Sequence, residues 1–186
     1  MISDDNPFAG RLLNGENVLW SGRPGQGIVL TPQDGYLIPF SLLWCGFAVF
    51  WESSVVNMHA PLFFMLWGVP FVLVGLFMVI GRFLVDAWLR RRIHYAVTDQ
   101  RLLIIRGEPF GKFTALGLKQ LPQADLIERT DGSGTIRFGS PANWASVGYR
   151  GWGLWLGPAL SPTPQIFRVG DVRKVFNLVQ EAVRRG

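Results

Sequence analysis

The sequence predicts an integral membrane protein, in which a membrane hairpin of two helices is joined to a small α+β domain built mainly from antiparallel strands. Composition is the first reason, since 49% of the 186 residues are hydrophobic and only 17% are charged, whereas ordinary soluble domains have about 25% charged residues. The second reason is a pair of long uncharged runs in the first half of the chain. The third is a series of short strand-like segments in the second half, followed by an amphipathic stretch. With 22 Gly and 12 Pro, the chain is interrupted too often for an all-helical bundle.

Two apolar runs are predicted to span a membrane. Residues 1–34 come first and are net acidic. The run 35–51 extends about 25 Å as a helix, and the run 60–81 extends about 33 Å, against a hydrocarbon core of about 30 Å. The pattern also allows the second helix to continue to residue 92. The alternative is a buried helix pair in a soluble protein, and it is disfavoured because so small a domain cannot bury two helices that are apolar all round.

The basic residues predict how the hairpin is oriented. Four arginines follow the second run, namely Arg82, Arg90, Arg91 and Arg92, whereas the loop 52–59 has no Lys or Arg. Because Lys and Arg resist translocation, the loop is expected outside and both termini in the cytoplasm. No small-residue cleavage site follows the first run, so the spans are expected to be retained. The arginines either fix orientation only or also contact anionic lipid headgroups, a contact worth about 1 kcal/mol for each basic residue near the surface.

Residues 93–186 are predicted to form the cytoplasmic domain. Apolar and polar residues alternate in IHYAVT, as they do in a half-buried strand. The expected strands are 93–98, 102–105, 114–121, 124–130, 135–138 and 166–169, with a turn at 131–134. The segment 171–185 has apolar residues at helical spacing, which predicts one closing helix. Residues 18–21 also have the composition of a strand that adds to this domain, which would place Trp20 in its core.

A long loop rich in Trp, Gly and Pro is expected at 140–164. It includes Trp144, Trp152 and Trp155, which are the candidate interface residues. Tryptophan favours the headgroup level of a membrane, and it equally serves to cover an open sheet edge. Loops of this length are typically functional or disordered. Membrane contact, packing and disorder therefore stay open.

The inventory of chemical motifs disfavours an enzyme. The sequence has no G-x-S-x-G, no P-loop and no H-E-x-x-H motif. His59 and His94 are expected on opposite sides of the membrane, and Cys45 is the only cysteine. No catalytic residue, metal site, cofactor or small-molecule substrate is therefore predicted, and no motif indicates nucleic-acid binding. Neither span contains an ionisable residue, which disfavours a transporter or channel core.

Two motifs carry a resemblance to a known family. The stretch GENVLWSGRP at 15–24, the two spans and the stretch YAVTDQRLLI at 95–104 together resemble the bacterial membrane-anchored pleckstrin-homology-like domain family. The resemblance implies a location in the bacterial inner membrane and a pleckstrin-homology-like barrel capped by the C-terminal helix. It supplies no catalytic residues. Better-known pleckstrin-homology domains hold phosphoinositides on a longish loop between their first two strands; here the corresponding link is expected to be the tight turn 98–101, which argues against such a pocket.

The expected function is binding rather than catalysis. We expect a membrane-anchored module that recruits or scaffolds a protein partner, or assembles with copies of itself, at the cytoplasmic membrane face. Two alternatives remain from the sequence. One is a sensor of anionic lipids, and the other is an accessory subunit of a membrane enzyme or transporter.

Overall fold

The computed structural model describes residues 7–8, 10–109, 111–139, 157–161 and 163–185. The chain divides into two compact units. The helical unit consists of residues 28–87 with 151–160, and the β-unit consists of residues 1–27, 88–150 and 161–186. Each unit is described by itself below.

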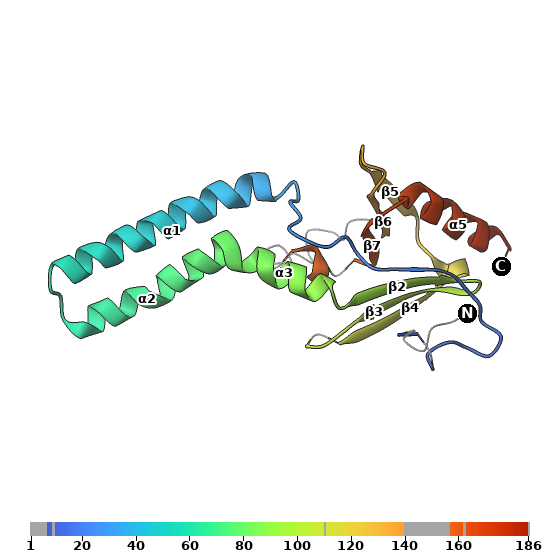
Figure 1. Ribbon diagram of the computed structural model, residues 1–186, viewed down its shortest axis with the longest axis horizontal. Helices are drawn as coiled ribbons and strands as arrows, with labels where there is room; N and C mark the ends of the chain where they lie inside the picture. The colour runs from blue at the N-terminus through green and yellow to red at the C-terminus, as the bar shows by residue number, and fades with distance from the viewer. Residues whose placement is uncertain (1–6, 9, 110, 140–156, 162, 186) are drawn as a thin grey trace. The chain divides into compact units, whose positions relative to one another are not determined.

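The helical unit is an antiparallel hairpin (Figure 1). Helix α1 covers Asp34–Asn57, and α2 covers Leu62–Leu76. A π-helix, η1 (Phe77–Gly81), follows α2 directly and leads into α3 (Arg82–Arg90). The two predicted apolar helices are therefore present, and the second continues nearly as far as expected.

The boundary of the first helix differs from the prediction. Glu52 was expected to open the connecting loop, but α1 continues to Asn57, so the link between α1 and α2 is only 58–61. A charged residue ends a hydrophobic run without ending the helix, because Glu and the following Ser-Ser-Val-Val are all tolerated in helical geometry. Glu52 consequently lies inside the hairpin, where its side chain is next to Gly68.

Glycine allows the two helices to approach closely. A Cβ atom on Gly75 would lie 2.9 Å from the Cα atom of Cys45, so a larger residue there would force the backbones apart. By contrast, Gly46 on α1 has nothing within 4 Å of such an atom. The close packing is therefore local to one side of the hairpin.

Both helical segments, Asp34–Asn57 and Leu62–Arg90, are long and apolar enough to cross a membrane. Only 11% and 17% of the residues in their most apolar stretches are buried. A core helix of a soluble protein would be mostly buried, because its apolar side chains would be covered by the rest of the protein. Most of the large apolar side chains of this hairpin are exposed instead.

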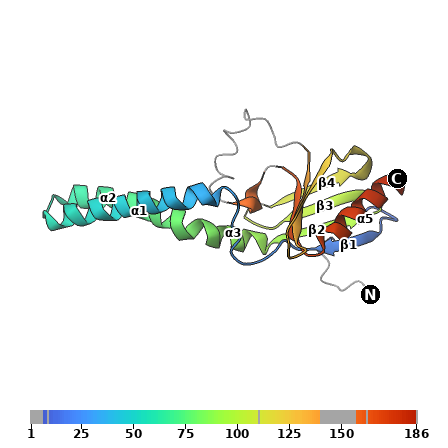
Figure 2. The same ribbon diagram turned by 90° about the horizontal axis from the view of Figure 1, so that it is seen from above.

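The β-unit contains two antiparallel sheets and a C-terminal helix (Figure 2). Sheet A has the order β1-β2-β3-β4, with strands Val18–Gly22, Ile93–Thr98, Arg101–Arg106 and Lys112–Gly117. Sheet B has the order β5-β6-β7, with strands Ala124–Glu128, Gly134–Phe138 and Gln165–Val169. Helix α5 covers Val172–Arg185. The described strands form two separate sheets, not a closed barrel.

Most predicted strands are found close to their expected positions. The predicted strand 114–121 is an exception, since β4 ends at Gly117 and a short 3-10 helix, η2 (Leu118–Gln120), follows. A short 3-10 helix, η4 (Pro158–Leu160), belongs to the helical unit. Helix α5 buries Val172, Val175, Val179 and Ala182. This three-to-four spacing is the apolar face that the sequence predicted.

The N-terminal segment supplies the first strand of sheet A. Strand β1 pairs with β2 in antiparallel register, from Val18 opposite Thr98 to Gly22 opposite Tyr95. The hairpin is thus inserted between two neighbouring strands of one sheet. Trp20 is only half-buried, so it is not the core residue that was expected.

The position of β1 also corrects the expectation about the first two strands. The tight turn 98–101 joins β2 to β3, whereas the link between β1 and β2 is the whole stretch 23–92. The length of that turn therefore carries no argument about a ligand between the first two strands. A short sequence cannot show which strand is first in a sheet when the pairing partners are about 70 residues apart.

Phe8 anchors the N-terminal segment to sheet A. Its side chain is 1% exposed and packs in a cluster with Ala96, Leu103 and Ile105. Burying a phenylalanine is worth about 1.5–3 kcal/mol. Phe8 is therefore part of the core of the β-unit, although it lies before β1 in the sequence.

Candidate functional site

Two of the four arginines that were predicted to lie at the membrane surface are buried and bind other groups of the protein. Arg82 is buried and forms an ion pair with Asp34, with 2.8 Å from Nη1 to Oδ1. Arg90 is fully buried, and its guanidinium donates hydrogen bonds to the backbone carbonyls of Gly25 and Gly27. These contacts give both arginines a structural role in addition to any effect on orientation.

The other two predicted arginines are exposed. Arg91 and Arg92 lie between α3 and β2. The guanidinium of Arg92 stacks on the Trp88 ring, 4.0 Å from its centroid, and donates to the carbonyl of Glu108 at 2.8 Å. Contact of Arg91 and Arg92 with headgroups stays a prediction.

The strand register of sheet A places further basic residues near Arg91 and Arg92. Arg23 directly follows β1, Arg106 ends β3 opposite Ile93, and Lys112 begins β4 opposite Arg106. The Gly107 N–H donates to the carbonyl of Arg92, which closes this row. We call this row, Arg23, Arg91, Arg92, Arg106 and Lys112, the basic end of sheet A. It is the end at which the chain leaves for α1 and returns from α3.

At the basic end, Tyr95 links the two sheets to each other, and Arg106 links sheet A to the segment that precedes β7. The Tyr95 hydroxyl accepts the N–H of Phe167 at 3.3 Å, and Arg106 donates to the carbonyl of Ser161 at 2.9 Å. Burial raises the pKa of Tyr95 to about 12 and lowers the pKa of Arg106. Tyr95 is therefore neutral at pH 7 and serves as a hydrogen-bonding group, not as a base.

His94 also belongs to this end of the sheet. Partial burial and the positive charge of Arg23 both lower its pKa from the ordinary value of 6.5. At pH 7 the imidazole is consequently neutral. The positive charge of the basic end comes from its arginines and its lysine.

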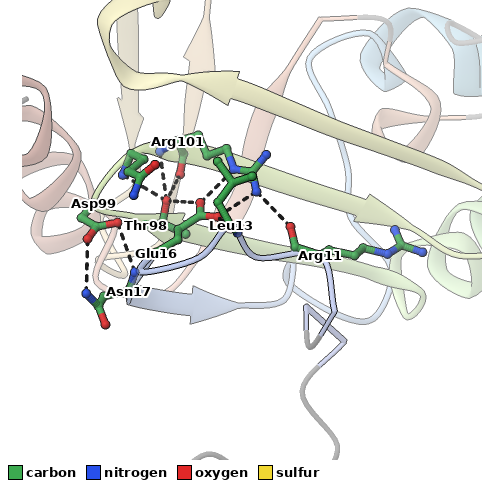
Figure 3. A network of polar contacts seen from close by, with 8 residues as sticks. Arg11, Leu13, Glu16, Asn17, Thr98, Asp99 and Arg101 are labelled. Atoms are coloured by element: carbon green, nitrogen blue, oxygen red, sulfur yellow. Dashed lines mark hydrogen bonds and ion pairs between the residues drawn. The ribbon is translucent and has the colours of Figure 1, made fainter.

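The opposite end of sheet A carries a polar network (Figure 3). Glu16 accepts four hydrogen bonds: Oε1 from Thr98 Oγ1 at 2.7 Å and Arg101 Nε at 2.8 Å, and Oε2 from Arg101 Nη2 at 2.7 Å and Leu13 N at 2.7 Å. The Arg101 side chain is the largest cause that holds the pKa of Glu16 at about 2. We call Glu16, Thr98 and Arg101 the clasp, because they tie the N-terminal segment to the β2–β3 turn.

The clasp connects the two sequence motifs that carry the family resemblance. Glu16 comes from the stretch 15–24, whereas Thr98 and Arg101 come from the stretch 95–104. Beside them, the Asn17 N–H donates to Asp99 Oδ1 at 3.1 Å. Every clasp side chain has partners within the protein, so these three residues stabilise the fold.

A shallow groove of about 640 Å³ lies between α5 and the β5–β6 turn. Charged residues dominate its lining, and Arg173 pairs with Glu128 across it at 2.6 Å. Among the described residues, no group of three His, Cys, Asp or Glu side chains is placed to hold a metal ion. The groove has no arrangement of nucleophile and base that would indicate catalysis.

Trp144, Trp152 and Trp155 lie outside the described residues, so their predicted interface role is neither supported nor opposed. Comparison with protein-family models, curated proteins and solved structures finds no match for the chain. The candidate site is therefore the basic end of sheet A. Sequence reasoning missed Arg23, Arg106 and Lys112 there, because only the strand register brings them beside Arg91 and Arg92.

Proposed function

We propose that the protein is a non-enzymatic binding module anchored in the bacterial inner membrane. The observation that carries this proposal is the insertion of an exposed apolar hairpin between two paired strands, β1 and β2. Because both chain connections to the hairpin come from the same end of one sheet, the β-unit is tethered at two points.

The charges favour the cytoplasmic face. One hairpin puts both ends of the chain on the same side of the bilayer, and the basic end of sheet A adjoins it in sequence on that side. The described link at 58–61 contains no Lys or Arg. The positive-inside rule then places the β-unit in the cytoplasm.

The element order supports the pleckstrin-homology-like interpretation. The antiparallel strands are followed by a closing C-terminal helix, as the resemblance implies. The outer strands β1 and β4 leave sheet edges that another strand can join. We propose a protein partner, or a second copy of the chain, as the bound species.

Affinity purification from mildly solubilised native membranes tests this function. The expected result is a full-length protein that stays in the membrane after an alkaline carbonate wash and brings a specific protein, or further copies of itself, through purification. Recovery of the protein with lipid alone would contradict recruitment. A large enzyme or transporter complex that loses activity without this chain would favour the accessory-subunit alternative.

A second candidate function is contact with anionic lipids. The basic end supports it, since each basic residue near an anionic surface contributes about 1 kcal/mol. Full-length protein in nanodiscs of neutral lipid or of phosphatidylglycerol is the appropriate sample, because a fragment 93–186 lacks β1 and Phe8. Greater protection of Arg91 and Arg92 from chemical modification in the anionic discs is expected, and equal protection in both would contradict lipid contact.

A further inference from the structure

Arg82 has one edge of its guanidinium without a partner. Its Nη1 atom binds Asp34, but Nε and Nη2 are buried and have no hydrogen-bond partner in the part of the chain that the structure describes. These two nitrogens lie on the same edge of the planar group, where two parallel N–H bonds can bind two oxygens of one oxyanion. The residue as a whole is only 6% exposed, so the missing bonds are costly.

Asp34 cannot supply the missing acceptors. Its Oδ1 atom is bound by Arg82, and its Oδ2 atom accepts both the N–H of Thr31 at 2.5 Å and the hydroxyl of Thr31 at 2.8 Å. The Phe83 ring stacks against the guanidinium, with its centroid 4.4 Å from Cζ. Stacking on a ring occupies a flat face and leaves the edge unbonded.

The π-helix sets the position of this arginine. A π turn contains one additional residue, which rotates the following residues by about 100° around the helix axis. Arg82 is the first residue after η1, and it faces Asp34 at the start of α1. The pair therefore marks one end of the apolar hairpin, where a spanning helix meets the phosphate groups of the lipids.

We propose that the free edge of Arg82 binds the phosphate of a phospholipid, with Asp34 holding the arginine in place. This inference rests on the proposed membrane insertion of the hairpin. The shared chemistry is that of a phosphate oxyanion, and among its sources the phospholipid is the one present at this depth. Both nitrogens are covered in the structure, so the proposal requires neighbouring side chains to move aside when the phosphate enters.

The mode of binding differs from that of an exposed basic patch. The Asp34–Arg82 pair has no net charge, so directed hydrogen bonds provide the attraction. Binding at Arg82 is therefore insensitive to salt, whereas attraction of lipid to Arg91 and Arg92 is screened. It also extends to zwitterionic phospholipids, because the phosphate itself is recognised.

Arginine Nε–H resonances of full-length protein in dodecyl maltoside provide the test. Phosphatidylglycerol and phosphatidylethanolamine are each expected to shift the Arg82 signal, and the shift is expected to persist at about 0.5 M salt. Monogalactosyldiacylglycerol, which has no phosphate, is expected to leave it unchanged. An unchanged Arg82 signal with both phospholipids, or an equal shift with the galactolipid, would overturn the proposal.

Variants and free phosphate complete the experiment. Arg82→Lys keeps the charge but loses the two-nitrogen edge, so it is expected to weaken phospholipid binding about tenfold or more. Arg185→Lys, at an exposed position of α5, is the matched control and is expected to bind as the wild type does. An equal response to inorganic phosphate would overturn the assignment to lipid. Retention in the membrane after a carbonate wash distinguishes failure of this inference from failure of the proposed membrane insertion. A protein that is retained but shows no shift of the Arg82 signal refutes lipid binding at Arg82 alone. A protein that is released by the wash refutes membrane insertion.

Discussion

Glu16 shows how one carboxylate holds a distant segment in place. It accepts two bonds from Arg101, and its carboxylate is buried. We expect Glu16→Gln to lower the free energy of unfolding by about 1.5–3 kcal/mol, because charge-assisted hydrogen bonds are lost. Denaturant unfolding of the full-length protein in detergent measures this change. Asp99→Asn is the control at the exposed side of the same turn, with an expected change of about 0.5 kcal/mol or less.

The same carboxylate predicts a dependence of stability on pH. The pKa of Glu16 is about 2 in the folded protein, against an ordinary value of 4.5. A lowered pKa in the folded state stabilises the protein above pH 4.5, and this contribution is lost as the pH falls from 4.5 towards 2. The wild type is therefore expected to lose stability over this range more steeply than Glu16→Gln. Parallel curves for the two proteins would contradict the assignment.

Arg90 and Arg91 are neighbours with different roles. Arg90 satisfies the carbonyls of Gly25 and Gly27 from a fully buried position, whereas Arg91 is exposed. Arg90→Ala removes two charge-assisted hydrogen bonds and empties the space of a fully buried side chain, so we expect a loss of about 2–4 kcal/mol. Arg91→Ala is expected to change stability by about 0.5 kcal/mol or less. Thermal unfolding of the two variants side by side provides the measurement, and equal melting temperatures would refute the structural role of Arg90.

At the scale of elements, a glycine determines how closely α1 and α2 pack. Gly75→Ala places a Cβ atom 2.9 Å from the backbone of Cys45, and a backbone atom cannot move aside as a side-chain end can. We expect a loss of about 1–3 kcal/mol from this overpacking. Gly46→Ala meets nothing within 4 Å and is expected to be neutral or stabilising, because alanine favours the helix. The free energy of unfolding of both variants is measured in the same detergent. An unchanged value for Gly75→Ala would show that the helices do not pack this closely.

Elements were predictable where a pattern is local. The apolar runs, the alternation in 93–98 and the helical spacing in 171–185 each depend on near neighbours, and each element is present. The extension of α1 past Glu52 was missed because a charged residue ends an apolar run without ending a helix, and no local pattern indicates the π-helix at Phe77–Gly81. The clasp and the basic end depend on the pairing of β1 with β2 across the inserted hairpin, which no local pattern contains.

At the scale of the whole molecule, the β-unit is predicted to fold without the hairpin if its first strand is retained. Gly22 lies opposite Tyr95, so a short Gly/Ser linker in place of 23–92 can join β1 to β2. We expect this variant to be soluble and to show cooperative unfolding. A fragment 93–186 is expected to aggregate, because it lacks both β1 and the Phe8 side chain. Cooperative folding of that fragment would show that the N-terminal segment is dispensable.

The central claim is that the hairpin, which lies in sequence between the paired strands β1 and β2, spans the membrane and that the β-unit is in the cytoplasm. A Cys45→Ala background allows single cysteines at Met58, in the link between α1 and α2, and at Gln100, in the β2–β3 turn, both of which are exposed. The direct measurement is labelling of intact cells with a membrane-impermeant maleimide. Met58→Cys is expected to react in intact cells, and Gln100→Cys only after the inner membrane is permeabilised. Reaction of Gln100→Cys in intact cells, or of neither site until permeabilisation, would contradict the claim.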